Sequence, residues 1–249
     1  MKRQNILITG ASSGLGLTMA KQFAALGRNL ILCARRLENL EQLKQTLLTI
    51  NPTIHVSISE LDVNNDEQVF AVFKQAKAEF GNIDRVIVNA GIGQGGSIGT
   101  GCFAENKHTA MTNFVAALVQ CEAAMAIFRE QNFGHLVTIS SVSSQCGFAK
   151  SMTVYAATKA ALASLTEGIR IDVLDTPIRV TTIHPGYIAT EITNPDKKLP
   201  FIVNVDVGCK AIIKAVEREV NVAFVPFWPW AMMRYLLRIL PLAFMRRLN

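Results

Sequence analysis

The sequence predicts an α/β domain built on a doubly wound parallel sheet, because two kinds of segment alternate along most of its 249 residues. Short apolar runs rich in β-branched residues are typical of buried parallel strands. Longer segments with apolar residues at helical spacing lie between these runs and predict helices. Regular alternation of strand and helix places helices on both faces of one parallel sheet.

Each element follows in chain order from these patterns. The predicted strands are residues 6–9, 30–34, 55–59, 85–89, 135–140, 178–184 and 222–225. The predicted helices are residues 14–26, 37–49, 65–80, 105–131, 153–175 and 206–218. About seven strands without a linker or repeat predict a single Rossmann-type domain over residues 1–226, followed by an extension over 227–249. Ligands of such sheets bind beyond the carboxyl ends of the strands.

A glycine-rich turn follows the first predicted strand and leads directly into a helix. Its residues are Thr9-Gly10-Ala11-Ser12-Ser13-Gly14-Leu15-Gly16. Glycine lets the backbone turn sharply and approach a phosphate closely, and a helix N-terminus offers free N–H groups to an anion. We therefore expect Gly10, Ser12, Ser13, Gly14, Leu15 and Gly16 to bind the pyrophosphate of a dinucleotide. An ordinary tight turn is the alternative.

The end of the second predicted strand indicates which dinucleotide binds. Sites that select NAD usually place an acid about 20 residues beyond the glycines, to bind the ribose 2′-hydroxyl. Here the position is Ala34, and Arg35 and Arg36 follow. A guanidinium matches a 2′-phosphate in charge and geometry, so we expect NADP(H), with Arg35 as the favoured contact. A solvated basic pair is the alternative.

Polar or small residues follow the later strands. Asp62 comes after the third strand and is a candidate partner of the adenine amino group. Asn89-Ala90-Gly91 follows the fourth strand, where small residues let a ligand lie against the backbone.

Tyr155 and Lys159 are candidates for the chemistry. They lie four residues apart in a predicted helix and therefore share one face. A nearby ammonium favours the phenolate, so we expect Lys159 to lower the pKa of Tyr155. A phenol tuned in this way can exchange a proton with a carbonyl or an alcohol. A Tyr/Lys pair is often only structural, but Ser140 and Ser141 at the end of the fifth strand offer hydroxyls that can hold a substrate oxygen.

These pieces together resemble a classical short-chain dehydrogenase/reductase. The matching residues cover positions 5 to about 225 in the order typical of the family. They are Thr9-Gly10-x3-Gly14-x-Gly16, Asp62-Val63, Asn89-Ala90-Gly91, Asn113, Ser141, Tyr155-x3-Lys159, and Pro185-Gly186 with Thr190.

The resemblance implies a role for each matching residue. Tyr155 resembles the acid/base and Ser141 the residue that polarises the substrate oxygen. Lys159 resembles the residue that lowers the tyrosine pKa and holds the nicotinamide ribose, and Asn113 the support of a water relay to it. Ile188 and Thr190 resemble contacts to the nicotinamide amide, and Pro185 and Gly186 are further cofactor contacts that the resemblance implies. Ala34-Arg35 resembles the NADP-preferring form of the second strand end.

Several classes of function are disfavoured. The net charge is +6, but the positive charges do not cluster densely enough for a nucleic-acid surface. The histidines lack ligand spacing, so no metal site is predicted, and His184 is interpreted as structural. The five cysteines show no CxxC spacing, which predicts reduced thiols and a cytoplasmic protein. The sequence shows no signal-peptide pattern, and we expect a protein that does not span a membrane.

Residues 227–249 continue beyond the point where many members of the family end. They contain both tryptophans, four arginines and no acid. Three uses fit this composition: a lid over an apolar substrate, a subunit contact, and peripheral binding to an anionic membrane. All three favour a lipophilic carbonyl or alcohol substrate. The long, weakly charged helices 105–131 and 153–175 favour a homodimer or homotetramer.

Two functions remain open from the sequence. The first is an NADP(H)-dependent oxidoreductase that acts on a ketone, an aldehyde or the matching alcohol. The second is a catalytically silent NADP(H)-binding sensor or scaffold. The intact set of Asn113, Ser141, Tyr155 and Lys159 favours the enzyme.

Overall fold

Seven strands form one parallel sheet in the computed structural model, which describes residues 3–191, 193 and 199–243. The strands lie in the order β3-β2-β1-β4-β5-β6-β7. Their bounds are β1 Asn5–Thr9, β2 Asn29–Ala34, β3 Val56–Glu60, β4 Arg85–Val88, β5 Gly134–Ile139, β6 Ile178–Pro185 and β7 Val222–Val225. The predicted doubly wound sheet is confirmed. Strands β2 and β3 lie on one side of β1 and strands β4 to β7 on the other, so the strand order reverses between β1 and β4, where such sheets bind ligands.

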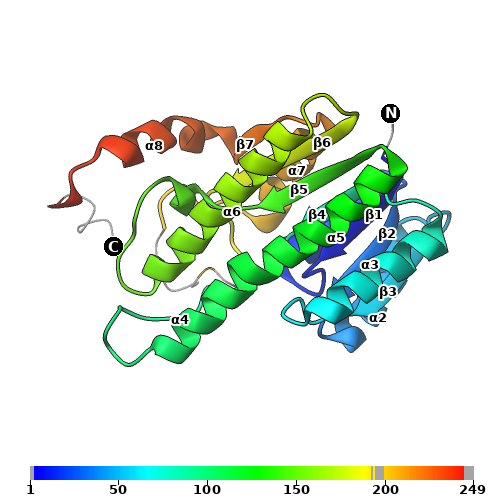
Figure 1. Ribbon diagram of the computed structural model, residues 1–249, viewed down its shortest axis with the longest axis horizontal. Helices are drawn as coiled ribbons and strands as arrows, with labels where there is room; N and C mark the ends of the chain where they lie inside the picture. The colour runs from blue at the N-terminus through cyan, green and yellow to red at the C-terminus, as the bar shows by residue number, and fades with distance from the viewer. Residues whose placement is uncertain (1–2, 192, 194–198, 244–249) are drawn as a thin grey trace.

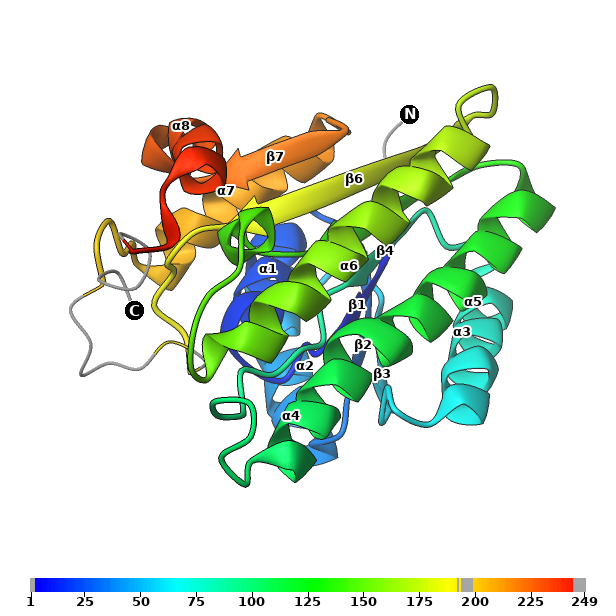
Figure 2. The same cartoon turned by 60° about the vertical axis from the view of Figure 1, so that its left-hand side comes forward.

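Helices cover both faces of this sheet (Figure 1, Figure 2). Strand residues alternate between two apolar cores, with Ile6 and Ile8 in one and Leu7 in the other. Helices α1, α2 and α7 pack into the first core, and α3, α5 and α6 pack into the second. The helix bounds are α1 Gly14–Ala25, α2 Leu37–Ile50, α3 Asp66–Phe80, α4 Phe103–Ala110, α5 Ala116–Gln131, α6 Met152–Asp172, α7 Val205–Glu217 and α8 Phe227–Ile239.

The long helix expected over 105–131 is interrupted by a wider turn. Helices α4 and α5 are joined by a π-helical segment, Met111–Val115, so one helical rod runs over Phe103–Gln131. The rod is long and apolar enough to cross a membrane, but 61% of its most apolar stretch is buried. Its side chains, including Ala124 and Phe128, pack in the core against the sheet. This packing accounts for its apolar composition.

Helix α6 ends at Asp172, three residues before the predicted boundary. Pro177 disfavours a helical conformation for Thr176, and the chain turns before β6 begins at Ile178.

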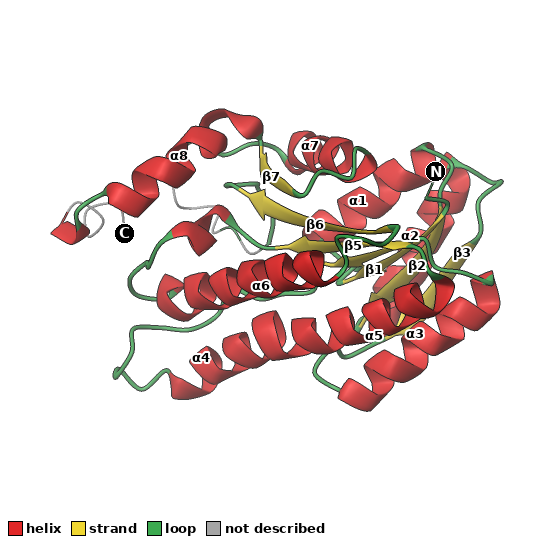
Figure 3. Ribbon diagram, turned by 45° about the horizontal axis from the view of Figure 1, so that its top comes forward, coloured by secondary structure: helices red, strands yellow, loops and turns green. Residues whose placement is uncertain are grey.

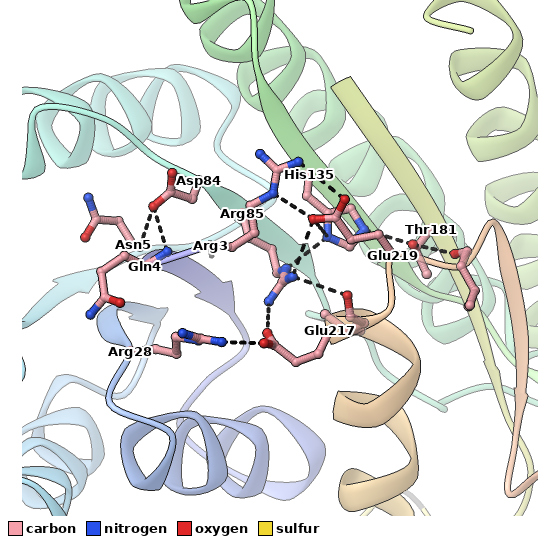
Figure 4. Close-up of polar contacts among 12 residues, drawn as sticks. Arg3, Gln4, Asn5, Arg28, Asp84, Arg85, His135, Thr181, Glu217 and Glu219 are labelled. Carbon is pink, nitrogen blue, oxygen red and sulfur yellow. Dashed lines mark hydrogen bonds and ion pairs between the residues drawn. The ribbon is translucent and has the colours of Figure 1, made fainter. Parts of the chain in front are cut away.

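A network of arginines and glutamates closes the edge of the sheet where the strands begin (Figure 4). Arg85 is buried at the start of β4 and donates to Glu217 at 2.5 Å. Arg28 pairs with the same carboxylate, and Arg3 donates to Glu219 at 2.7 Å. Burial raises the pKa of Glu217, but Arg85 and Arg28 outweigh this effect and hold it below its usual value. The network anchors the end of α7 to the strands.

His135 belongs to this network and is fully buried. Its Nδ1 accepts from Arg85 Nε at 2.9 Å, so the proton lies on Nε2, which contacts Thr181 Oγ1 at 2.8 Å. Burial, together with the charges of Arg85 and Arg3, keeps the pKa of His135 well below its ordinary value. His135 is therefore a neutral structural histidine.

Helix α8 extends beyond the sheet from the end of β7 (Figure 3). Trp228 is extended because Pro229 follows it, and the regular helix starts at this proline. Trp230 and Leu237 face inward and are buried. Trp230 packs with Val142 and Phe224 in a small third core. The extension expected at 227–249 thus begins as a helix attached to the domain.

Candidate active site

The glycine-rich turn after β1 is shaped by close backbone contacts. Gly10 has φ +63°, and a Cβ on it would lie 2.9 Å from Ala90 Cα. A Cβ on Gly16 would lie 2.3 Å from the Gly10 carbonyl oxygen. Both positions therefore exclude a side chain. The turn presents the N-terminus of α1 toward the switch point of the sheet, where a phosphate group fits.

Thr9 and Asn89 lock this turn to the end of β4. The Thr9 hydroxyl accepts from the backbone N–H groups of Asn89 at 3.1 Å and Ala90 at 3.2 Å. In return, Asn89 Nδ2 donates to the carbonyls of Thr9 at 2.9 Å and Gly10 at 3.3 Å. The sequence predicts Asn89 as a cofactor contact, whereas in the structure its side chain hydrogen-bonds the backbone of the glycine-rich turn and holds that turn in place.

Arg36 reaches the glycine-rich turn from the end of β2. Its Nε and Nη2 lie 3.3 and 3.2 Å from Ser12 Oγ. Arg35 and Arg36 are both exposed. The sequence favours Arg35 as the contact to a 2′-phosphate, whereas the geometry directs Arg36 toward the turn. Both residues lie beyond β2, which ends at Ala34, and Arg36 is the N-cap residue of α2, so the spacing from the glycines does not show which of the two turns toward Ser12.

Asp62 lies beyond β3, beside the same end of the site. Its Oδ1 accepts from the Asn64 backbone N–H at 3.0 Å and from Asn64 Nδ2 at 3.2 Å. Val63 next to it is buried. Asp62 thus shapes the turn into α3 as well as standing at the predicted adenine position.

Ser141, Tyr155 and Lys159 converge at the ends of β5 and α6. Ser141 follows β5, and its side chain is hydrogen-bonded to Tyr155. Lys159 is buried, and its Nζ lies 5.8 Å from the centroid of the Tyr155 ring. Lys159 Nζ donates to the Ile139 carbonyl at 2.9 Å, while Ser140 Oγ donates to the Lys159 carbonyl at 2.8 Å. These bonds fix one turn of α6 against the end of β5.

The pKa values at this site differ from the expectation for Tyr155. Burial raises the pKa of Tyr155 above its ordinary value, and the hydrogen bond with Ser141 only partly opposes it. The expectation that Lys159 gives Tyr155 a lowered pKa is therefore wrong for this structure. Burial also lowers the pKa of Lys159 to about 8, which weakens its influence as a permanent cation.

Asn113 lies on the π-helical segment and joins the same site. Its Oδ1 accepts from the Ile92 N–H and its Nδ2 donates to the Ile92 carbonyl, both at 2.8 Å. A Cβ on Gly91 would lie 3.1 Å from Asn113 Oδ1 and 3.4 Å from Lys159 Nζ. Asn113 and Lys159 therefore meet at Gly91. A π turn often marks a functional position, and the helical spacing of the sequence did not reveal it.

The segment after β6 closes the opposite side of the site. A Cβ on Gly186 would lie 2.0 Å from Trp230 Nε1, so α8 requires glycine there. Ile188 is buried in the core, which leaves its backbone as the part available to a ligand. A Cβ on Gly14 would lie 3.6 Å from Thr190 Cβ, so Thr190 reaches across to the glycine-rich turn. Pro185 is the last residue of β6.

His184 has a role that the sequence did not show. Its Nδ1 lies 3.1 Å from the Ser141 carbonyl and 3.0 Å from Ser144 Oγ. Ser144 uses its own proton on the Ser141 carbonyl at 2.6 Å, so His184 Nδ1 must be a donor. Burial lowers the pKa of His184 to about 4, and its ring stacks on Phe224. His184 therefore holds the backbone of Ser141 as a neutral donor.

Comparison with known proteins gives a consistent family. The family model described as short chain dehydrogenase matches residues 4–199. An uncharacterized oxidoreductase of Mycobacterium tuberculosis is 49% identical, with 98% of this chain and 97% of that protein covered.

Solved structures agree with the fold. A short-chain dehydrogenase from Sphingobium yanoikuyae in complex with NADPH is 28% identical, with a TM-score of 0.83 and coverage of 94% of this chain and 92% of that one. A short chain dehydrogenase/reductase from Burkholderia phymatum in complex with NAD is 22% identical, with a TM-score of 0.83 and 94% coverage of both chains.

Proposed function

This chain belongs to the short-chain dehydrogenase family and is an oxidoreductase, and from that premise we propose that it transfers hydride between NADP(H) and a carbonyl or alcohol. The observation that carries the proposal is the convergence of Ser141, Tyr155 and Lys159, with Asn113 behind them, at one edge of the sheet. This edge is also the one toward which the glycine-rich turn faces.

The residues present fit a dinucleotide. Gly10 and Gly16 let the glycine-rich turn pack directly against itself and against the end of β4, which sets the start of α1 at the switch point of the sheet. The N-terminus of α1 suits the pyrophosphate, and Arg36 at Ser12 suits a phosphate on the adenosine ribose. We expect Ala90, Gly186 and Thr190 to line the path between them. When bound, the cofactor supplies or accepts the hydride.

The side chains of the chain itself handle the proton. Because burial raises its pKa, Tyr155 is a neutral phenol at neutral pH and can donate a proton to a carbonyl oxygen. The Ser141 side chain is hydrogen-bonded to Tyr155, so it can hold the substrate oxygen within reach of the Tyr155 hydroxyl. Lys159, held by Ile139, can favour the phenolate left behind. Asn113 fixes the backbone at Ile92 beside it.

Apolar surfaces around the site support an apolar substrate and an oligomer. The Trp230 ring, which lies against Gly186, makes edge-to-face contacts with two other rings. Its centroid is 5.2 Å from that of Tyr187 and 6.2 Å from that of Phe201. A shallow groove between α4 and α6 is lined by small and apolar residues such as Ala110, Val154 and Ala157. We expect this groove to bury against a second copy in a homodimer or homotetramer. Five free cysteines in the described chain support a cytoplasmic location.

Turnover by the purified protein tests the proposal. NADPH consumption is measured with a panel of ketones and aldehydes that increase in chain length. We expect consumption that depends on the carbonyl compound and favours the more apolar ones. Binding of NADPH without turnover of any compound would instead identify a silent NADP(H)-binding protein.

We expect His184 to act as a positioning residue for Ser141. His184→Leu removes the donor to the Ser141 carbonyl and should lower kcat by about tenfold, the upper range for one hydrogen bond, with NADPH affinity unchanged. His184→Asn retains a donor at a similar position and should recover most of the rate. Equal rates for the wild type and the leucine variant would show that the bond has no influence on turnover.

A further inference from the structure

The outer face of α8 carries an exposed apolar stripe. We define the outer stripe as Trp228, Met232, Tyr235, Leu236 and Ile239. Met232, Tyr235, Leu236 and Ile239 follow helical spacing, and exposed fractions across the stripe run from 43% for Leu236 to 77% for Ile239. The inner face, with Trp230 and Leu237, is buried, so the helix is anchored while its outer stripe is left in solvent.

Positive charge accompanies the outer stripe. No Asp or Glu occurs from Val220 to Asn249, whereas this stretch contains four arginines. Arg238 is exposed on the helix. Arg234 is half-buried, with its guanidinium over the rings of Phe224 and Tyr235. Arg246 and Arg247 lie outside the described residues. The face therefore suits a partner that carries negative charge.

From these observations we propose that the outer stripe of α8 binds the surface of an anionic phospholipid membrane. Large aliphatic side chains suit the acyl boundary, and Trp and Tyr favour the headgroup level. Arginines beside them suit lipid phosphates. A helix of this kind lies in the plane of the membrane without crossing it.

A second copy of the chain fits a different surface. The groove between the α4–π-helical segment and α6 is shallow, and alanines such as Ala157 and Ala161 lie in it beside Phe114 and Val115, so it suits the approach of a second helical surface. The outer stripe instead presents large side chains on a helix that projects from the domain (Figure 3). The two apolar surfaces therefore differ in shape, one being a groove on the domain and the other the outer face of a projecting helix.

Helix α8 lies close to the active site, so membrane binding through its outer stripe would place the active site near the lipid. Helix α8 starts at the carboxyl end of β7, on the same edge of the sheet as the catalytic side chains, and Trp230 packs on Val142 directly after Ser141. Phe201, which is 56% exposed and touches Trp230, extends the apolar surface. Docking therefore brings the active site next to the lipid, which suits an apolar substrate; this consequence alone rests on the proposed function.

Vesicle flotation of the full chain tests the proposal without an activity assay. The vesicles contain phosphatidylcholine alone or phosphatidylcholine with phosphatidylglycerol. We expect stronger binding to the anionic vesicles and weaker binding at high salt. Arg238→Gln should weaken binding to anionic vesicles by about fivefold, the factor that corresponds to about 1 kcal/mol for one arginine.

Substitutions in the outer stripe locate the contact. The double variant Met232→Glu/Ile239→Glu should lose at least about tenfold in vesicle binding, because two large apolar side chains no longer enter the lipid. Phe70→Glu is the matched control, since Phe70 is 48% exposed on α3 and outside the stripe. Light scattering and circular dichroism verify the mass and the fold of each variant.

Two results would overturn the proposal. One is flotation that is absent for the wild type or unchanged in the double variant. The other is a protein that ignores vesicles but whose mass falls in the double variant, which would make the outer stripe a subunit contact. Quenching of Trp228 fluorescence by brominated lipid, lost in Trp228→Phe, gives an independent positive result because Trp230 is buried.

Discussion

Tyr155→Phe is expected to lower kcat by at least about 100-fold while NADPH still binds, because the change removes one hydroxyl and leaves the ring in place. The phenol is the proton donor that lies in hydrogen-bond contact with Ser141. Its raised pKa keeps the proton on the oxygen at neutral pH, which suits reduction of a carbonyl. Steady-state turnover together with NADPH titration by fluorescence separates the loss of chemistry from a loss of binding.

Tyr235→Phe is the matched control for this prediction. Tyr235 is exposed on α8, so removal of its hydroxyl should leave kcat unchanged. Near-normal turnover by Tyr155→Phe would show that another group donates the proton.

The second large effect concerns the choice of cofactor. Arg36→Ala should reduce the preference for NADPH over NADH by roughly 10- to 150-fold, which corresponds to about 1.5–3 kcal/mol for a hydrogen bond to a charged group. The reason is its position against Ser12 in the glycine-rich turn. Arg35→Ala should have a smaller effect, and the double variant should remove the preference. Affinities for both cofactors, measured by titration, give the ratio directly.

Lys74→Ala serves as the control for charge. Lys74 is exposed on α3, so its loss changes the net charge by the same amount at a different place. Equal affinity of the wild-type protein for NADPH and NADH would contradict the assignment of the arginines. A larger effect of Arg35→Ala than of Arg36→Ala would restore the interpretation from the sequence.

Much of the fold could be predicted because it depends on local pattern. The strand at Asn5–Thr9 is buried along its whole length, and the sequence shows its centre as the apolar run Ile6-Leu7-Ile8. The glycines at 10 and 16 could be interpreted because a glycine-rich turn between a strand and a helix is a pattern within one stretch of chain. Tyr155 and Lys159 share a face by helical spacing alone. These features require only neighbouring residues.

The parts that the sequence did not reveal depend on contacts between distant residues. His184 bonds the carbonyl of a residue 43 positions away, and Gly186 is required by Trp230. The raised pKa of Tyr155 results from burial, which spacing does not measure. The π turn at Asn113 keeps the apolar pattern of a helix, so the sequence does not distinguish it from an ordinary turn. The oligomer and the substrate class stay predictions.

Isotope transfer tests the central claim most directly. The protein is incubated with a ketone that it consumes and with NADPH that carries deuterium at both hydrogens of nicotinamide C4. We predict an alcohol product that contains one deuterium on the former carbonyl carbon, formed by the wild type and at least about 100-fold more slowly by Tyr155→Phe. NADPH that binds without forming a labelled alcohol from any carbonyl compound of the panel would contradict the proposed hydride transfer.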